Sequence, residues 1–199
     1  MEPSLLMTCF EPFAGRSTNT SMRLLGPMLV SPPSGVATRV LPVDFKALRR
    51  IVPRLVRTLR PKRWLLLGEH ASTERMRCER VAINTLDGTV ADNNGRLPSG
   101  KAVRGGPAAY FATLDPARLV THFEQHGIPA SLSDDAGTYA CNFALYLALH
   151  HGRRHGTPVE VGFVHVPRSY RRTGQGLQVL RASMADLANK LAEEDCEAA

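Results

Sequence analysis

Short apolar runs alternate along this chain with segments whose apolar residues recur at helical spacing. This alternation is typical of an α/β fold, in which helices cover the faces of a sheet. The clearest helix lies near the end of the chain, where an apolar stripe has a three-four spacing: Leu177, Leu180, Met184, Leu187 and Leu191. No linker, repeat or low-complexity segment divides the 199 residues. We therefore expect a single three-layer α/β/α domain over residues 1–199, with a central twisted, mostly parallel (mixed) sheet.

The apolar runs and their flanking residues predict the elements in order. The expected strands are Leu5–Phe10, Arg39–Val43, Trp64–Leu67 with Gly68 as its stop, Arg80–Ile83, Ala130–Leu132 and Val159–Val164. The expected helices begin after the caps Asn19, Asp44, Asp115 and Thr173, with a further helix over Cys141–His150. Pro53 should kink or delay the second helix, which ends near Leu59, and Leu86–Gly106 reads as a long loop.

Three segments place reactive side chains at the boundaries of expected elements. DAGTYACN sets Cys141 at a helix start, where backbone N–H groups and the helix dipole favour a thiolate. GFVHVP sets His165 at the carboxyl end of a strand, and ERVAIN supplies Glu79. A thiol, an imidazole and a carboxylate together predict a cysteine nucleophile with its base and orienting acid. The alternatives are a buried packing cysteine, a hydrogen-bonded structural histidine, and a surface ion pair of Glu79 with Arg77 or Arg80.

These segments also carry a family resemblance. The chain resembles the type I pyroglutamyl peptidases, cysteine peptidases that remove an N-terminal pyroglutamyl residue from peptides. The matching segments, from Leu5 to about Pro167, are TCFEPFAGRSTNTS, LPVDF, ERVAIN, DNNGRLP, GGPAAYF, DAGTYACN and GFVHVP. The resemblance implies Cys141 as nucleophile, His165 as base and Glu79 as its orienter, with no metal or organic cofactor. It also implies a small peptide or amide substrate and a homo-oligomer, commonly a tetramer.

The resemblance further assigns a substrate pocket. Phe10 and Phe13 would enclose the flat lactam ring, although packing beneath the loop is an alternative for both. Tyr139 and Ala140 would line the same pocket, and backbone N–H groups around Cys141 would form the oxyanion hole.

Several positions depart from the family pattern. The family glutamine is Glu69, two family arginines are Thr73 and Thr89, and two family glycines are Cys9 and Ala14. An ionised Glu69 needs a cationic partner, for which His70, a neighbouring arginine or a cationic substrate are candidates. A Glu69 kept neutral by burial would instead mimic the amide. Whether Arg75 or Arg77 replaces the lost arginines stays open at this point.

Two other functions are compatible with the sequence. A divergent family member would use the same three residues on a different small amide or in acyl transfer. A non-catalytic module would use its basic surface, since the net charge is +7 and basic residues gather in Lys46–Arg63 and Arg153–Arg172, including Arg168, Arg171 and Arg172. The first basic segment has an apolar face, which favours a solvated helix over a nucleic-acid site: Leu48, Ile51, Val52 and Leu55.

The cysteines and the termini bear on the compartment. Cys9, Cys78, Cys141 and Cys196 form no CxxC pair or metal-ligand spacing, so we expect reduced thiols. The first ten residues lack a basic segment of the signal-peptide type, and the apolar runs are too short to span a membrane. These features predict a cytoplasmic protein that needs no membrane.

Overall fold

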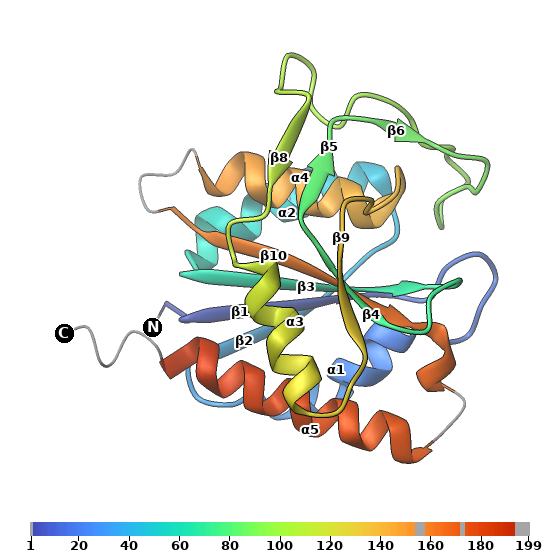
Figure 1. Cartoon of the computed structure of the whole chain (residues 1–199). Coiled ribbons are helices and arrows are strands. Elements are labelled where there is room, and N and C mark those ends of the chain that lie inside the picture. The colour runs from blue at the N-terminus through green and yellow to red at the C-terminus, as the bar shows by residue number, and fades with distance from the viewer. Residues whose placement is uncertain (1, 154–157, 172–173, 194–199) are drawn as a thin grey trace.

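A six-stranded sheet forms the centre of the computed structural model, which describes residues 2–153, 158–171 and 174–193 (Figure 1). The strand order is β2-β1-β3-β10-β4-β9. Its strands are β1 (Leu5–Phe10), β2 (Val36–Leu41), β3 (Arg63–His70), β4 (Met76–Glu79), β9 (Ala130–Ser133) and β10 (Glu160–Pro167). The first four neighbours in that order pair in parallel, whereas β4 runs antiparallel to β10 and parallel to β9. The predicted mixed, mostly parallel sheet is confirmed.

Helices cover both faces of this sheet. They are α1 (Thr20–Val30), α2 (Phe45–Leu59), α3 (Pro116–Gln125), α4 (Ala140–Gly152) and α5 (Gly174–Glu193). Figure 1 shows α2 and α4 on one face and α1, α3 and α5 on the other. Each face has its own apolar core, with Leu48 and Phe143 in one and Leu24 and Leu180 in the other. The three-layer prediction is therefore confirmed, and no helix in the described ranges is long and apolar enough to cross a membrane.

The predicted helix caps lie where the sequence placed them. Asn19 accepts a hydrogen bond from Ser21 N, Asp44 accepts from Lys46 N, and Asp115 accepts from Ala117 N. The second helix begins directly after Asp44 despite Pro53, so the predicted delay is wrong. Burial of the apolar stripe on this helix outweighs the one backbone hydrogen bond that a proline removes. The predicted cap Thr173 lies outside the described residues.

Several strand boundaries differ from the prediction. Strand β3 continues through Gly68 to His70, because Gly68 pairs with His165 in the neighbouring strand β10. Strand β2 begins and ends earlier than Arg39–Val43, and β10 extends to Pro167. Strands β4 and β8 (Ala109–Phe111) were not predicted, and β8 pairs with β5 (Val81–Ile83). The expected loop after Leu86 contains the short pair β6 (Leu86–Asp87) and β7 (Ser99–Gly100).

Candidate active site

The sheet brings Glu79 and His165 together. Glu79 is the last residue of β4, which pairs antiparallel with β10, the strand that carries His165. His165 Nδ1 lies 2.7 Å from Glu79 Oε1, and the two side chains are buried, with relative exposures of 3% and 0%. Because a carboxylate only accepts hydrogen bonds, Nδ1 carries the hydrogen in the neutral ring. His165 Nε2 is then the nitrogen that can take up a proton.

The second oxygen of Glu79 lacks a hydrogen bond. Among the described residues, Oε2 is the one buried side-chain oxygen or nitrogen without such a partner. Arg77 Nε lies 3.5 Å from Oε1, so part of the predicted ion pair with an arginine is present. Arg77 also donates to Ser133 Oγ and to the Asp135 carbonyl, which fixes the guanidinium beside Glu79. Arg80, the other predicted partner, pairs with Asp134.

The Cys141 thiol lies against the sheet at Gly68, the residue that pairs with His165. Cys141 is the second residue of α4 and is partly buried. A Cβ atom built on Gly68 would lie only 2.8 Å from Cys141 Sγ, so the thiol packs on bare backbone. Gly68 is the cross-strand neighbour of His165. The fold thus gathers a thiol, an imidazole and a carboxylate that are far apart in the sequence.

The environment of Cys141 opposes ionisation of its thiol. Burial raises the pKa of the Cys141 thiol to about 12, and the negative charges of Glu79 and Glu69 add to the effect. These effects act against the helix start, which the sequence predicts to favour a thiolate, and that expectation stays a prediction. A base must remove the proton before the sulfur can attack, and His165 lies on the adjacent strand.

Asn142 anchors the start of α4, a role that sequence reasoning missed. Its side chain accepts from Ile83 N at 2.9 Å and donates to the carbonyl oxygens of Ile83 and Thr85. A buried amide at the start of an otherwise apolar helix is the signal that could have indicated this role. The N-cap residue, Tyr139, makes no side-chain capping bond to the first N–H groups of α4. Tyr139 instead donates its hydroxyl to the Ala91 carbonyl.

All five predicted substrate-binding residues border one pocket that Cys141 also lines. The lining residues are Phe10, Phe13, Asn19, Val43, Glu69, Tyr139, Ala140 and Cys141. The space between them, including open solvent at its mouth, is about 230 Å³. Asn19 and Val43 were not predicted as lining residues, although Val43 belongs to the LPVDF segment.

Aromatic side chains form much of the pocket wall. The rings of Phe13 and Tyr139 have centroids 5.9 Å apart, and the Arg16 guanidinium lies 4.9 Å from the centroid of Phe13. Phe10 also packs against Phe163 beneath the pocket, with centroids 6.4 Å apart. The alternative of core packing is thus partly true for Phe10, which is 2% exposed.

Four hydrogen bonds hold the Glu69 carboxylate. Oε1 accepts from Arg16 Nη1 and Arg168 Nε, both at 2.9 Å. Oε2 accepts from the backbone N and the hydroxyl of Thr20, both at 2.7 Å. Burial by itself raises the pKa of Glu69, but the bonds from Thr20 and Arg168 outweigh it and leave the pKa below its usual value.

Of the two alternatives for Glu69, the lowered pKa favours the ionised carboxylate over the neutral acid that would mimic an amide. Its cationic partners are Arg16 and Arg168. His70, another predicted partner, instead packs edge-on against His165, with ring centroids 5.2 Å apart. Arg168, one of the residues of the predicted basic surface, donates its Nε–H to Glu69, so its side chain does not face solvent alone. The Arg171 side chain and Arg172 lie outside the described residues.

The two threonines at family arginine positions do not enter this cluster. Thr73 Oγ1 donates to the Arg75 carbonyl and accepts from Arg75 N, which closes a local turn. Thr89 is exposed. Arg77 supports Glu79 and Ser133, so the positive charge beside the pocket comes from Arg16 and Arg168.

The two residues at family glycine positions lie in or after β1. Cys9 is fully buried, and burial raises its pKa to about 12. Ala14 has a φ of 53°, in the left-handed region that favours glycine. The first loop therefore stores strain next to Phe13, which lines the pocket.

Comparison with known proteins decides the family. The family model described as pyroglutamyl peptidase matches residues 3–185. The chain belongs to the pyroglutamyl peptidase family. It is 37% identical to the pyrrolidone-carboxylate peptidase of Thermococcus kodakarensis, with 96% of each chain covered. It is 40% identical to that of Cupriavidus necator over 82% of this chain and 78% of the relative.

Solved structures of the pyroglutamyl peptidase family have the same fold. The pyrrolidone carboxyl peptidase from Thermococcus litoralis superposes with a TM-score of 0.85 at 29% identity, over 99% of this chain and 96% of that one. The enzyme from Fervidobacterium islandicum gives a TM-score of 0.84 at 28% identity, over 96% and 99%. This chain is accordingly a cysteine-type peptidase of the pyroglutamyl peptidase family.

Proposed function

We propose that the protein hydrolyses the amide bond after an N-terminal pyroglutamyl residue, with Cys141 as nucleophile, His165 as general base and acid, and Glu79 as the residue that orients His165. One observation carries the proposal. The Cys141 thiol borders a small, mostly apolar pocket and lies beside the strand on which His165 is hydrogen-bonded to Glu79.

The reaction begins with proton transfer from Cys141 Sγ to His165 Nε2 as the sulfur attacks the amide carbonyl. Glu79 holds Nδ1–H and stabilises the imidazolium that forms. The oxyanion accepts hydrogen bonds from the first backbone N–H groups of α4. These groups are available because the side chain of the N-cap residue, Tyr139, does not bind them. When the tetrahedral intermediate collapses, the carbon–nitrogen bond breaks and His165 gives its proton to the leaving amine.

The pyroglutamyl group is then bound to Cys141 as a thioester. His165 removes a proton from water, the oxygen attacks the thioester carbonyl, and the carbon–sulfur bond breaks. The thiolate regains a proton from His165, and pyroglutamate leaves. This sequence uses side chains, backbone N–H groups and water, and routes no step through a metal or organic cofactor.

The pocket supports recognition of a flat, uncharged ring. Phe10, Phe13 and Tyr139 provide apolar surfaces, and the only ionised side chain among the pocket-lining residues is Glu69. Each Glu69 oxygen already accepts two hydrogen bonds, so this carboxylate has little capacity left for a cationic substrate. We therefore favour a neutral lactam over a positively charged N-terminal group.

A divergent specificity is the second candidate, and the Glu69 cluster is the observation that favours it. The resemblance places a neutral glutamine at position 69, whereas this chain has a charged Glu69 that binds Arg16 and Arg168. A different small amide would then occupy the same pocket and use the same three residues. The basic-module alternative has less support, because Arg168 pairs with Glu69.

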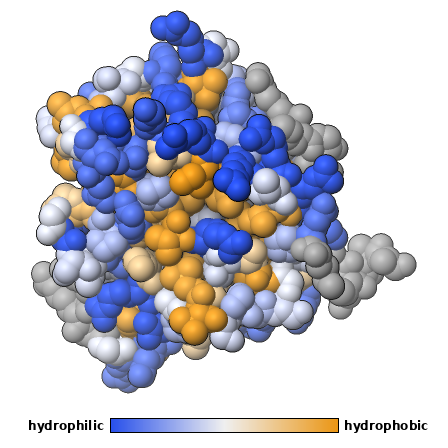
Figure 2. All heavy atoms as spheres, turned by 180° about the vertical axis from the view of Figure 1, so that it is seen from behind, coloured by the Kyte–Doolittle hydropathy of each residue, from blue (hydrophilic) through white to orange (hydrophobic). Residues whose placement is uncertain are grey.

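We also propose a cytoplasmic homo-oligomer, a tetramer by resemblance to the family, built from one domain per chain. Figure 2 shows apolar side chains gathered in the middle of one face of the molecule, among charged ones. Such a patch suits contact with a second copy of the chain. Light scattering of the purified protein would measure the mass of the assembly.

The deciding experiment measures release of a fluorogenic amine from a pyroglutamyl amide by the native protein and by Cys141→Ala. We expect native turnover, and a loss of at least about 10⁴-fold in the variant. Alkylation with iodoacetamide, mapped by mass spectrometry, reports the reactivity of Cys141, with the buried Cys9 and Cys78 as internal controls. Absent turnover with a Cys141 that is alkylated faster than Cys9 and Cys78 would support the divergent specificity, whereas equally slow alkylation of all three thiols would contradict the catalytic proposal.

A further inference from the structure

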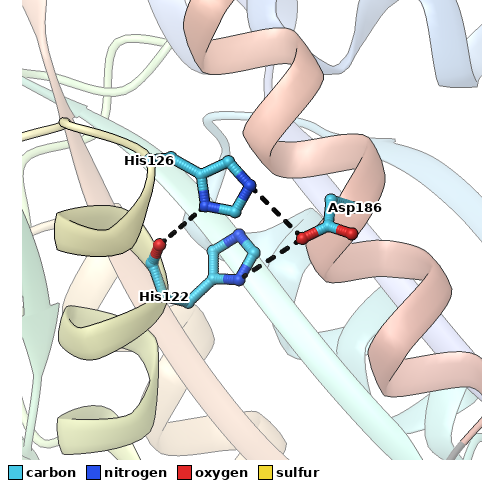
Figure 3. A group of neighbouring side chains, drawn as sticks. All are labelled: His122, His126 and Asp186. Atoms are coloured by element: carbon cyan, nitrogen blue, oxygen red, sulfur yellow. Dashed lines mark hydrogen bonds and ion pairs between the residues drawn. The ribbon is translucent and has the colours of Figure 1, made fainter.

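A second group of chemically active side chains lies on the other face of the sheet from Cys141. His122 of α3, His126 at the end of α3 and Asp186 of α5 each offer one ligand atom, and these atoms lie within 4.8 Å of one another (Figure 3). Helices α3 and α5 cover the face opposite to α4, the helix that carries Cys141 (Figure 1). The group is therefore independent of the proposed catalytic residues.

Hydrogen bonds to backbone carbonyls fix the tautomers of both histidines. His122 Nε2 lies 2.9 Å from the Ser183 carbonyl oxygen, and His126 Nδ1 lies 2.8 Å from the His122 carbonyl oxygen. A carbonyl only accepts, so each of these nitrogens carries the hydrogen. In the neutral rings, His122 Nδ1 and His126 Nε2 are then bare acceptors. Carbonyl bonds of this kind are the usual way in which proteins orient metal-binding histidines.

The two bare nitrogens face the same carboxylate oxygen. Asp186 Oδ2 lies 3.3 Å from His126 Nε2 and 3.9 Å from His122 Nδ1 (Figure 3). Three acceptors directed at one point repel one another unless a positive charge, either a proton on one of the rings or a metal ion, lies between them. Ligand atoms around a tetrahedral Zn²⁺ are about 3.4 Å apart, given bond lengths near 2.0–2.1 Å. The two nitrogen–oxygen distances, 3.3 and 3.9 Å, are near that value, and all three ligand atoms lie within 4.8 Å of one another.

We propose that His122, His126 and Asp186 form a binding site for a divalent transition-metal ion of the Zn²⁺ type, which joins α3 to α5. Two imidazoles and one carboxylate match the donor preference of Zn²⁺ and exclude a dedicated Mg²⁺ or Ca²⁺ site, which needs oxygen ligands. Asp186 and His126 are partly exposed, with 41% and 29% of their side-chain surface accessible. The ion enters from this side, and water completes its coordination.

The Lys190 ammonium group competes with a metal ion for the Asp186 carboxylate. Lys190 Nζ lies 2.7 Å from the same Oδ2 that the metal would use. Lys190 is therefore the competitor that the metal must displace.

The test uses untagged Cys141→Ala protein, so that the active-site thiol cannot bind the metal. After treatment with a chelator, the protein is titrated with Zn²⁺ in a calorimeter and with Co²⁺ in a spectrometer. We expect one saturable site per chain and weak visible Co²⁺ bands without the intense sulfur-to-metal absorption of a thiolate site. His126→Ala and Asp186→Asn, both at partly exposed positions, should raise the dissociation constant at least about ten-fold.

Two further variants sharpen the test. Lys190→Met removes the competing ammonium group and should lower the dissociation constant several-fold, a result that a merely structural ion pair does not give. His151→Ala removes a histidine outside the cluster and should leave the dissociation constant unchanged. Binding that persists unaltered in His126→Ala and Asp186→Asn, or no saturable binding below about 1 mM Zn²⁺, would overturn the proposal.

Discussion

Two buried carboxylates, Glu69 and Glu79, both act on the Cys141 thiol, but the fold treats them differently. Glu69 accepts four hydrogen bonds, from Arg16, Arg168 and both donors of Thr20. Glu79 has a short contact to His165 through one oxygen, while its other oxygen has no hydrogen-bond partner among the described residues. Both negative charges raise the pKa of the same thiol. Each oxygen of Glu69 thus has two hydrogen-bond donors, whereas Oε2 of Glu79 has none among the described residues.

From this difference we infer that Glu69 stabilises the pocket wall, whereas Glu79 takes part in the proposed reaction. Glu69 ties together the first loop, the start of α1 and the segment after β10, and this stabilises the pocket wall. An unsatisfied buried oxygen normally destabilises a fold, so Glu79 needs an explanation. In the proposed reaction, the His165 imidazolium adds a second positive charge beside Glu79, at 2.7 Å, which is closer than the Arg77 guanidinium at 3.5 Å. A carboxylate with few other donors directs more of its charge to that transient cation.

The largest effect should follow Glu79→Gln. An amide cannot stabilise the imidazolium as a carboxylate does, and it can favour the wrong tautomer of His165. We expect kcat to fall by about 10³–10⁴-fold. The melting temperature should stay unchanged or rise, because the variant removes a poorly satisfied buried charge. Steady-state kinetics and thermal denaturation on the same preparation check both parts, and activity within ten-fold of native would contradict the role given to Glu79.

Gly68→Ala should have the next largest effect, since it moves the thiol and leaves both carboxylates in place. The added Cβ would lie 2.8 Å from Cys141 Sγ and 2.7 Å from the Phe163 ring. A displacement of about 1 Å at a nucleophile lowers kcat/KM by about 10²-fold. Gly162→Ala is the matched control, because its Cβ would meet Leu114 at 3.2 Å and not the thiol.

The two glycine variants should therefore change different properties, stability in Gly162→Ala and catalysis in Gly68→Ala. Gly162→Ala should lower the melting temperature with kcat/KM close to native. Gly68→Ala should lower kcat/KM even at temperatures where the protein is fully folded. Equal kcat/KM in both variants would show that the thiol does not depend on the bare backbone beneath it.

Glu69→Gln should give the opposite pattern to Glu79→Gln. Its amide group turns an N–H₂ toward Thr20 or the arginines, where only an acceptor fits. We expect a loss of about 1–3 kcal/mol in the free energy of unfolding, the usual effect of an unsatisfied buried polar group. Because Arg16 and Arg168 are partly exposed, solvent screens the loss of the ion pairs themselves.

In kinetics, Glu69→Gln should act on binding and not on chemistry. We expect KM for the pyroglutamyl amide to rise about ten-fold as the pocket wall loosens, with kcat within about two-fold of native. If the variant cleaves better than the native protein, the charged cluster is a specificity change, and the divergent-substrate candidate gains support. A native melting temperature together with native KM would remove the anchor role from Glu69.

The sequence predicted the elements that depend on local patterns. Strand β1 and the caps Asn19, Asp44 and Asp115 lie where the residues indicated. Strand β4 was missed because MRCE is only four residues long and contains no β-branched or aromatic residue, and it becomes a strand by pairing with β10 and β9. Tertiary pairing overrides weak local propensity in such short strands.

In the candidate site, too, local sequence patterns predicted some features, and others depend on the whole fold. Cys141, His165 and Glu79 could be proposed because each lies in a recognisable segment, and the structure places Glu79 against His165. The partners of Glu69 could not be predicted, since Arg16 and Arg168 lie 53 and 99 positions away in the chain. The burial that opposes ionisation of Cys141 could not be predicted either, because a helix start is a local feature, whereas burial depends on the whole fold.

The smallest expected effect is on the ionisation of Cys141. A carboxylate repels a thiolate and so raises the pKa of the thiol, which means that removing one carboxylate charge lowers it. Glu69 is paired with two arginines, so the change in Glu69→Gln should be modest. We expect alkylation by iodoacetamide at fixed pH to be about three-fold faster in the variant, corresponding to about half a pKa unit.

The pH profile of the native protein tests the starting point of this argument. With a Cys141 pKa of about 12, the thiolate fraction increases about ten-fold for each pH unit across the neutral range. The alkylation rate measured from pH 7 to pH 9 should therefore rise steadily without a plateau. A plateau below pH 8 would mean that the thiolate is already formed at rest, and the helix start and His165 would then outweigh burial and both carboxylates.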